Sequence, residues 1–223
     1  MSPRGFSATA LFFAVLAAAA CSPRPPRPFP VGFLAPVSPR VAAEARRLGL
    51  EITPQAPQGA EVVAAARKVK DGEVMQDWAR LRCEAAGAAA RGASGLFFRL
   101  PSAPAGHDLL EYVEEWQALG RVLREILLMR PILQRGETIP APFAASSGVD
   151  RRAWSYEGRS YALLVNSSGA PVPLRENELL PWRALFFVRA DAREALAACG
   201  REFCLPPEGV LWLEGRVLPE RRP

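Results

Sequence analysis

Apolar residues in the first part of the chain occur in short runs separated by segments of helical periodicity. The runs Val31–Ala35, Leu50–Thr53 and Gly95–Leu100 have the length and apolar character of buried strands. Helical spacing begins after the first run at Ser38-Pro39, a pair typical of an N-cap and a first helical position. A strand, a helix and a second strand with tight connections predict a βαβ unit with parallel pairing.

Three longer segments also have helical patterns. The first two are Glu61–Lys70 and Met75–Arg91, and the second of these is rich in alanine. A third helix begins near Asp108, where Glu111 completes the spacing of a capping box. The apolar positions of the third helix repeat about every 3.6 residues along a wide face, which is typical of core packing. Pro131 is predicted to end this helix.

The pattern changes to short alternating segments in the last part of the chain. Turns containing Gly, Pro and Ser separate these segments, which favours an antiparallel β-sandwich. The predicted strands are Arg151–Tyr156, Arg159–Asn166, Val172–Leu174, Arg183–Arg189 and Val210–Leu213. The proline-containing stretch 136–148 is predicted to be a linker. We therefore expect an α/β part over residues 31–135 and a β-sandwich over residues 149–223.

Residues 1–20 have the pattern of a secretory signal peptide. Arg4 supplies a positive charge ahead of Ala8–Ala20, an apolar run too short to span a bilayer stably. Because three alanines lead into Cys21, the segment resembles the lipobox of bacterial lipoproteins, with Ala18 where leucine is commoner. The resemblance implies a diacylglyceryl group on the Cys21 thiol, cleavage before Cys21 and N-acylation of the new terminus. An ordinary signal peptide with an incidental cysteine and an uncleaved anchor are the alternatives.

Residues 21–30 are predicted to tether the folded part to the lipid. The segment Ser22–Pro30 contains five prolines, which favours an extended polyproline conformation. At about 3.1 Å per residue, it would hold the folded part about 25 Å from the membrane. Ser22 rather than Asp follows Cys21, which in lipoproteins of bacteria with two membranes implies the outer one. We expect a cell-envelope protein at the periplasmic face of the outer membrane, with membrane lipid as its partner through acylated Cys21.

Charge and motif content exclude several classes of function. The formal net charge is +5, but no basic run interleaved with aromatic residues occurs, so nucleic acid is not an expected partner. The single histidine, His107, and the lack of a Cys-x-x-Cys pair argue against a zinc site. Because the chain has no phosphate-binding or dinucleotide glycine motif and no Gly-x-Ser-x-Gly elbow, no cofactor is predicted. His107 is expected to belong to a helix cap.

Three cysteines remain besides Cys21. Cys199 and Cys204 enclose four residues, and export to the envelope permits a disulfide between them. The sequence leaves open whether Cys199 and Cys204 form a disulfide or remain reduced. Cys83 lies in an alanine-rich helical segment and is predicted to be a small buried apolar residue.

The order of elements from Met75 to Leu174 resembles the end of a (β/α)8-barrel glycoside hydrolase. An alanine-rich helix precedes Gly95–Leu100, and a long helix and a proline-containing link lead to the β part. In this resemblance, Gly95–Leu100 corresponds to the eighth barrel strand and the β part to the small sandwich that such enzymes often carry. A complete barrel takes about 250 residues, so the middle strands with the family's acid/base and nucleophile are missing. The predicted fold is a reduced barrel-like α/β part followed by a small antiparallel β-sandwich.

No catalytic residue is predicted. Asn177-Glu178 is similar to the family's acid/base motif, but it follows no barrel strand. Trp154, Tyr156 and Tyr161 are candidates for a sugar-stacking platform, and core packing is the alternative for aromatic residues that alternate along strands. We expect an envelope lipoprotein with a binding or structural role toward carbohydrate or an envelope protein. The alternative is a carbohydrate-active, glycoside hydrolase-like enzyme with a rearranged site.

Overall fold

The structure is a computed structural model, and it describes residues 28–69, 72–75, 77–102, 107–141, 143, 148–174, 182–184 and 203–216. The predicted signal peptide, Cys21, Asn177-Glu178 and Cys199 lie outside the described residues. Within the described part, no helix is long and apolar enough to cross a membrane.

The first part of the chain forms a four-stranded parallel sheet with the strand order β2-β1-β6-β3. Its strands are β1 (Val31–Leu34), β2 (Glu51–Thr53), β3 (Glu61–Ala64) and β6 (Leu96–Arg99). Helix α2 (Pro39–Arg47) connects β1 to β2, and the Ser38 side chain accepts a hydrogen bond from Val41 N at 3.2 Å. The predicted parallel βαβ unit and its N-cap are therefore confirmed.

A seven-residue loop, Pro54–Ala60, connects the two edge strands of this sheet. Because the strands are parallel, it runs from the carboxyl end of β2 to the amino end of β3, across three strand spacings, or about 14 Å, and along one strand length, or about 10 Å. Seven extended residues reach about 23 Å, which is enough. Near its end, the loop contacts the residue before Gly95, because Ser94 N donates to Gly59 O at 2.9 Å.

The predicted helix over Glu61–Lys70 is wrong. This segment forms β3 and then β4 (Ala66–Val69), which makes an antiparallel hairpin with β5 (Gly72–Met75). The sheet supplies the reason, since β3 pairs in parallel with β6 and buries Val63 at 4% exposure. Pairing along the strand outweighs the helical propensity of the alanines.

Two helices follow the hairpin. Helix α3 (Trp78–Arg91) begins after Asp77, whose side chain accepts a hydrogen bond from Arg80 N at 3.0 Å. After the short 3₁₀ helix η1 (Leu109–Glu111), helix α4 (Val113–Arg135) is the longest in the described chain.

Pro131 lies inside α4 and does not end it, contrary to the prediction. The proline ring is exposed, while the next residue, Ile132, is buried against the antiparallel sheet. Packing of Met129 and Ile132 on either side of the proline stabilises the helix through it. The helix then ends at Gly136, whose N–H donates to Ile132 O at 2.8 Å.

The last part of the chain forms antiparallel sheets, as predicted. The five-stranded sheet has the order β11-β13-β9-β8-β7, and β10 pairs with β12 in a second sheet. These strands are β7 (Glu137–Ile139), β8 (Val149–Tyr156), β9 (Arg159–Asn166), β10 (Val172–Leu174), β11 (Trp182–Ala184), β12 (Phe203–Leu205) and β13 (Val210–Arg216). Strand β7 lies in the predicted linker and pairs with β8.

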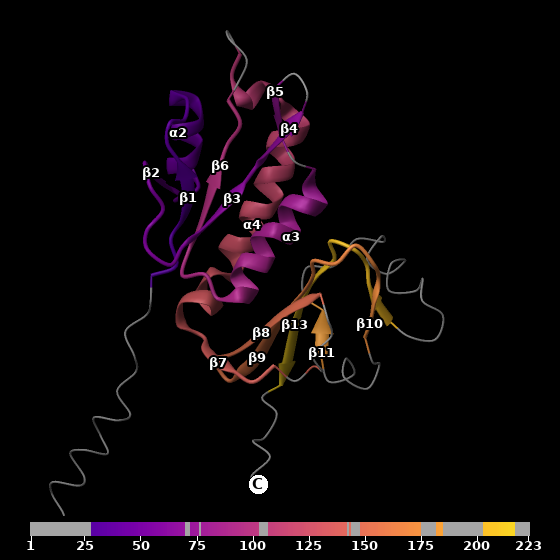
Figure 1. The fold of residues 1–223 in the computed structure, drawn as a ribbon. Helices are drawn as coiled ribbons and strands as arrows, with labels where there is room; N and C mark the ends of the chain where they lie inside the picture. The colour runs from indigo at the N-terminus through magenta and orange to yellow at the C-terminus, as the bar shows by residue number, and fades with distance from the viewer. Residues whose placement is uncertain are drawn as a thin grey trace, which may run out of the picture.

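Helices α3 and α4 lie between the parallel sheet and the five-stranded sheet (Figure 1). One side of α3 packs on the parallel sheet through Leu81 and Ala88, and the other side packs on the antiparallel sheet through Ala86 and Ala89. A helix with a sheet on two sides needs small side chains for close approach, which explains the alanine run. The architecture is mixed α/β, with one parallel sheet and antiparallel sheets.

Candidate functional site

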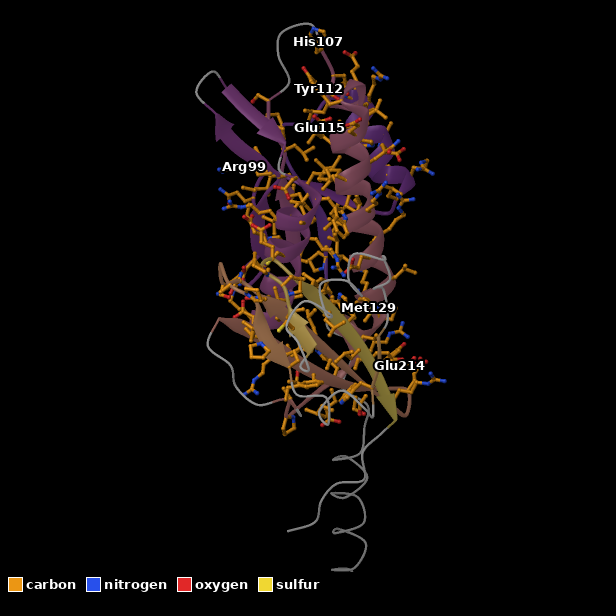
Figure 2. The ribbon with its side chains drawn as sticks, turned by 90° about the vertical axis from the view of Figure 1, so that its right-hand side faces the viewer. Arg99, His107, Tyr112, Glu115, Met129 and Glu214 are labelled. Atoms are coloured by element: carbon orange, nitrogen blue, oxygen red, sulfur yellow. The ribbon has the colours of Figure 1, made fainter. Side chains whose placement is uncertain are left out.

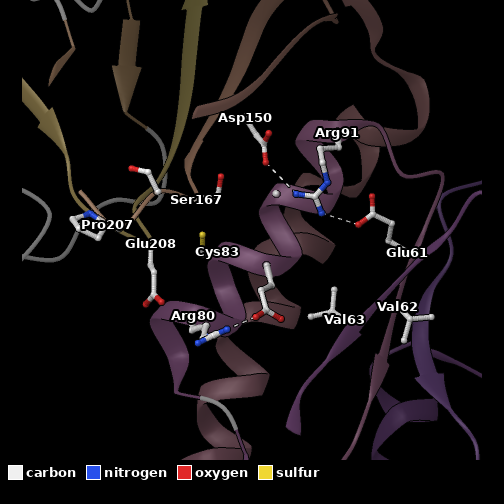
Figure 3. A pocket seen from close by; sticks show the side chains of 14 residues that line it. Glu61, Val62, Val63, Arg80, Cys83, Arg91, Asp150, Ser167, Pro207 and Glu208 are labelled. Atoms are coloured by element: carbon white, nitrogen blue, oxygen red, sulfur yellow. Dashed lines mark hydrogen bonds and ion pairs between the residues drawn. The ribbon is translucent and has the colours of Figure 1, made fainter. Parts of the chain in front are cut away.

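A cleft of about 520 Å³ opens beside α3, between edge strand β3 and the turns of the antiparallel sheets (Figure 3). Eight of the fourteen residues that line it carry a charge or a hydroxyl group. The lining consists of Glu61, Val62, Val63, Arg80, Cys83, Glu84, Gly87, Arg91, Asp150, Ser167, Ser168, Gly169, Pro207 and Glu208.

Helix α3 supplies one wall of the cleft. Arg80, Glu84, Gly87 and Arg91 are spaced by four, three and four residues, so they share one face of the helix. The Arg80 guanidinium pairs with Glu84, with 3.1 Å between Nε and Oε1. This hydrogen bond is the main cause of the raised pKa of Arg80.

Arg91 joins the two sheets across the cleft. Its Nη2 lies 2.8 Å from Oε2 of Glu61 on β3, and its Nη1 lies 3.0 Å from Oδ2 of Asp150 on β8. Hydrogen bonding to Glu61, the larger effect, and to Asp150 raises the pKa of Arg91. The guanidinium therefore occupies the space between two carboxylates from different sheets.

Gly87 lies next to the ion pair between Arg91 and Asp150. A Cβ atom at this position would lie 3.0 Å from Arg91 Nη1 and 3.6 Å from Asp150 Oδ2. The absence of a side chain at Gly87 thus leaves room for the guanidinium to reach Asp150.

The opposite wall is built from two turns held by one buried amide. Asn166 is fully buried, and its Nδ2 donates to Ala170 O at 2.8 Å and to Leu205 O at 2.9 Å. Its Oδ1 accepts from the backbone N–H of Ser168 at 2.9 Å. This network fixes the turn after β9 against the turn before β13, which carries Glu208 into the cleft.

Cys83 forms part of the cleft floor, and it is only 7% exposed. Its Sγ donates to the carbonyl oxygen of Asn166 at 3.5 Å. Burial, and then the charges of Glu208 and Glu84, raise the pKa of the thiol to about 11. The prediction of a small buried residue is confirmed, and the protonated thiol is a poor nucleophile at neutral pH.

The structure does not bring the predicted aromatic residues together as an open platform. Trp154 is 3% exposed and stacks on Trp212, with 5.9 Å between ring centroids, so its ring belongs to the core between the helices and the sheet. Tyr156 and Tyr161 are half-buried beside this core, with ring centroids 6.5 Å apart. None of the three lines the cleft.

His107 and Cys204 lie elsewhere in the fold. His107 is exposed at one end of the molecule, and its Nδ1 lies 3.0 Å from Oε2 of Glu111 (Figure 2). The neighbouring Asp108 caps η1 by accepting a hydrogen bond from Leu110 N at 2.9 Å. Cys204 is buried and disulfide-bonded. Since Cys199 lies outside the described residues, its pairing with Cys204 stays a prediction.

The described part of the chain shows no group of three His, Cys, Asp or Glu side chains that could hold a metal ion. The four parallel strands end at Leu34, Thr53, Ala64 and Arg99. Barrel hydrolases present their carboxylates at these strand ends, and none of the four residues here is a carboxylate. Four carboxylates and two guanidinium groups of the described chain line the cleft along α3 instead.

No protein-family model matches the chain, and no curated protein matches it in sequence. Solved structures that resemble it are glycoside hydrolases. Amy13B of Eubacterium rectale has 13% identity and a TM-score of 0.41, and the match covers 64% of this chain and 37% of that one. The GH27 β-L-arabinopyranosidase of Geobacillus stearothermophilus has 14% identity and a TM-score of 0.43, with 77% and 38% covered.

A GH30 endoxylanase of Clostridium papyrosolvens has 12% identity and a TM-score of 0.38, with 81% of this chain and 45% of that one covered. The chain thus spans less than half the length of each of these three enzymes. These structures belong to the class that the order of elements suggested.

The cleft itself was not predicted from the sequence. The spacing of Arg80, Glu84, Gly87 and Arg91 on one helix face is a visible signal, but it is also typical of a solvated face. Glu61, Asp150 and Glu208 are far apart in the chain, so only the packing of the two sheets around α3 brings them to the same cleft.

Proposed function

We propose that this protein is a lipid-anchored component of the bacterial cell envelope that binds a polar ligand in the cleft along α3 and performs no hydrolysis. The anchor is acylated Cys21, followed by the proline-rich tether, at the periplasmic face of the outer membrane. The folded body is a reduced barrel-like α/β part joined to a β-sandwich. One observation carries the non-catalytic assignment, namely the position of Arg91 between Glu61 and Asp150.

Hydrolysis of a glycosidic bond requires two carboxyl groups that face each other across the bond, about 5 to 10 Å apart. Glu61 and Asp150 bracket the cleft, but both bind the Arg91 guanidinium directly. In this arrangement the space that a sugar bond would need is occupied by a cation. The pair therefore supports structure and charge recognition rather than acid–base chemistry.

The cleft lining favours a polar ligand. Four carboxylates and two guanidinium groups line it together with Ser167 and Ser168. Such a surface offers hydrogen-bond donors and acceptors to sugar hydroxyls or to an extended segment of an envelope protein. Carbohydrate and an envelope protein are the ligand classes that we propose.

The anchor is tested by mass spectrometry of the mature N-terminus from cells that express the wild type or Cys21→Ser. We expect the wild type to begin at Cys21 and to carry diacylglyceryl and N-acyl groups. The variant should lack both modifications. An unmodified wild-type terminus would refute the lipoprotein assignment.

The absence of hydrolysis is tested by incubating the purified protein with α-glucan, β-glucan and xylan and measuring new reducing ends. We expect no release above that of a Glu61→Gln/Asp150→Asn variant. The alternative function, a carbohydrate-active enzyme with a rearranged site, requires release that disappears in that variant. Circular dichroism of both proteins shows whether the variant is folded.

A further inference from the structure

Helix α4 presents a basic face to solvent over its second half. The exposed positions there are spaced by three or four residues, so they form one stripe: Arg121, Arg124, Leu128, Pro131 and Arg135. Leu128 is 65% exposed, the largest exposure among the large apolar side chains in the described chain. A cationic stripe with an exposed leucine in its middle is typical of a helix that lies on a lipid surface.

The carboxylate in this part of α4 lies on the buried side of the helix. Glu125 is the only carboxylate between residues 121 and 135, and its side chain is only 13% exposed. Its Oε2 lies 2.7 Å from Arg82 Nε, and its Oε1 accepts from Trp212 Nε1 at 3.0 Å. The exposed side of this helical segment therefore carries positive charge without a carboxylate of its own.

The predicted tether joins the folded part of the chain beside the same segment of α4. Arg130 Nε donates to the backbone oxygen of Phe29 at 3.0 Å, and the Phe29 side chain is 3% exposed in the core. Seven residues lie between Cys21 and Phe29, so eight residue steps of extended chain place Cys21 within about 26 Å of this point. The stripe from Arg121 to Arg135 is about 21 Å long. The whole stripe thus lies within reach of a membrane that holds Cys21.

We propose that the exposed stripe of α4 docks onto the phospholipid surface, with its arginines on anionic headgroups and Leu128 at the boundary of the acyl chains. This proposal rests on the lipid anchor of the proposed function, which keeps the stripe near the bilayer at a high effective concentration. Figure 2 shows α4 along one side of the molecule, where Tyr112, Glu115 and Met129 are labelled. Docking would orient the cleft along α3 relative to the membrane.

The experiment uses the full lipidated chain, purified from membranes and carrying Leu128→Cys labelled with an environment-sensitive fluorophore. The protein is reconstituted into vesicles of phosphatidylcholine alone or with about 30% phosphatidylglycerol, which supplies the anionic surface. We expect the emission of the fluorophore to shift to shorter wavelength only in the anionic vesicles. This shift should disappear in high salt, because screening weakens the contacts between the arginines and the headgroups. An Ile52→Cys label on β2, at a site that is 37% exposed and does not line the cleft, should show no shift in either vesicle.

Charge variants in the Leu128→Cys background distinguish the stripe from general cationic attraction. Each arginine removed from the stripe should lower the equilibrium constant for docking about fivefold. Arg124→Gln should have this effect, whereas Arg99→Gln, which removes an exposed arginine of β6, should not. Equal effects of the two variants, equal shifts in both vesicle types, or no shift at all would overturn the docking proposal.

A separate experiment measures whether the unlabelled chain floats with neutral vesicles in a density gradient. A chain that floats without a blue shift at Leu128→Cys overturns docking and leaves the anchor intact. A chain that fails to float overturns the anchor itself. Binding of the stripe to a polyanion such as heparin, at matched salt and more tightly than to anionic vesicles, would also count against a lipid partner.

Discussion

Cys83 shows how a single side chain takes its chemistry from its position. The thiol lies between the apolar side of α3 and the charged cleft, where burial is the main cause of a pKa of about 11 in place of 9.0. Because the folded pKa lies above the unfolded value, the associated stability is present below pH 9 and declines as the pH rises from 9.0 toward about 11. The residue therefore acts as core packing rather than as a reactive group.

Alkylation tests this assignment. Two pKa units reduce the thiolate fraction at pH 8 on the order of 100-fold, and burial slows attack further. We expect iodoacetamide to modify Cys83 at least that much more slowly in the folded protein than in denaturant, as measured by mass spectrometry of the peptide containing it. Comparable rates in the two states would contradict the buried, protonated thiol.

Arg91, unlike Cys83, is a charged residue with substantial access to water. Its guanidinium is half exposed, so each of its two ion pairs adds little to stability alone. Its importance lies in geometry, because it keeps Glu61 and Asp150 at fixed positions on opposite sides of the cleft. A residue of modest energetic weight thus fixes the arrangement of charges in the cleft.

At the scale of elements, α3 depends on small residues. It contacts the parallel sheet on one side and the five-stranded sheet on the other, and its buried positions are dominated by alanine. Larger side chains on either side would push a sheet away from the helix. The alanine run is therefore a packing requirement of this layered arrangement as well as a source of helical propensity.

Ala88→Leu should destabilise the protein by about 1 to 3 kcal/mol, because Ala88 is fully buried between α3 and the parallel sheet and the added carbons would have to displace packed neighbours. Ala79→Leu, at an exposed position of the same helix, should change stability by less than about 0.5 kcal/mol. Urea unfolding followed by circular dichroism measures both variants. A similar loss in the two variants would show that helical context rather than packing is responsible.

At the scale of the whole molecule, a buried polar cluster connects the layers. Arg82 of α3 pairs with Glu125 of α4 and donates to Val210 O at 3.1 Å, while Trp212 of β13 donates to Glu125. The Arg82 and Glu125 side chains are only 11% and 13% exposed. Both helices are thus joined to the antiparallel sheet by charges with little access to water.

Glu125→Gln should cost about 3 to 5 kcal/mol, because Arg82 would remain buried without its charge partner. Glu44→Gln, which breaks an exposed pair with Arg47 on α2, should cost less than about 1 kcal/mol.

Differential scanning calorimetry should show one transition for the wild type, because α3 and α4 belong to the cores of both parts. Two separate transitions in the wild type would argue that the layers unfold independently.

The sequence alone determined the features that local chemistry specifies. The N-cap at Ser38, the strand Leu96–Arg99, the hairpin strands Val149–Tyr156 and Arg159–Asn166, and the burial of Cys83 all follow from capping groups, turns and periodicity. These signals lie within a few residues of the element that they specify. The tether and the lipidated Cys21 are likewise predictions from local motifs.

The tertiary structure decided whatever depends on partners distant in the chain. Glu61–Ala64 is a strand because β6 lies beside it, and α4 continues through Pro131 because Met129 and Ile132 pack on a sheet formed later in the chain. Trp154 is a core residue because Trp212 stacks on it, and Arg91 occupies the cleft because two sheets place carboxylates on both of its sides. The physical reason is common to these cases, since burial and charge pairing depend on which surfaces meet.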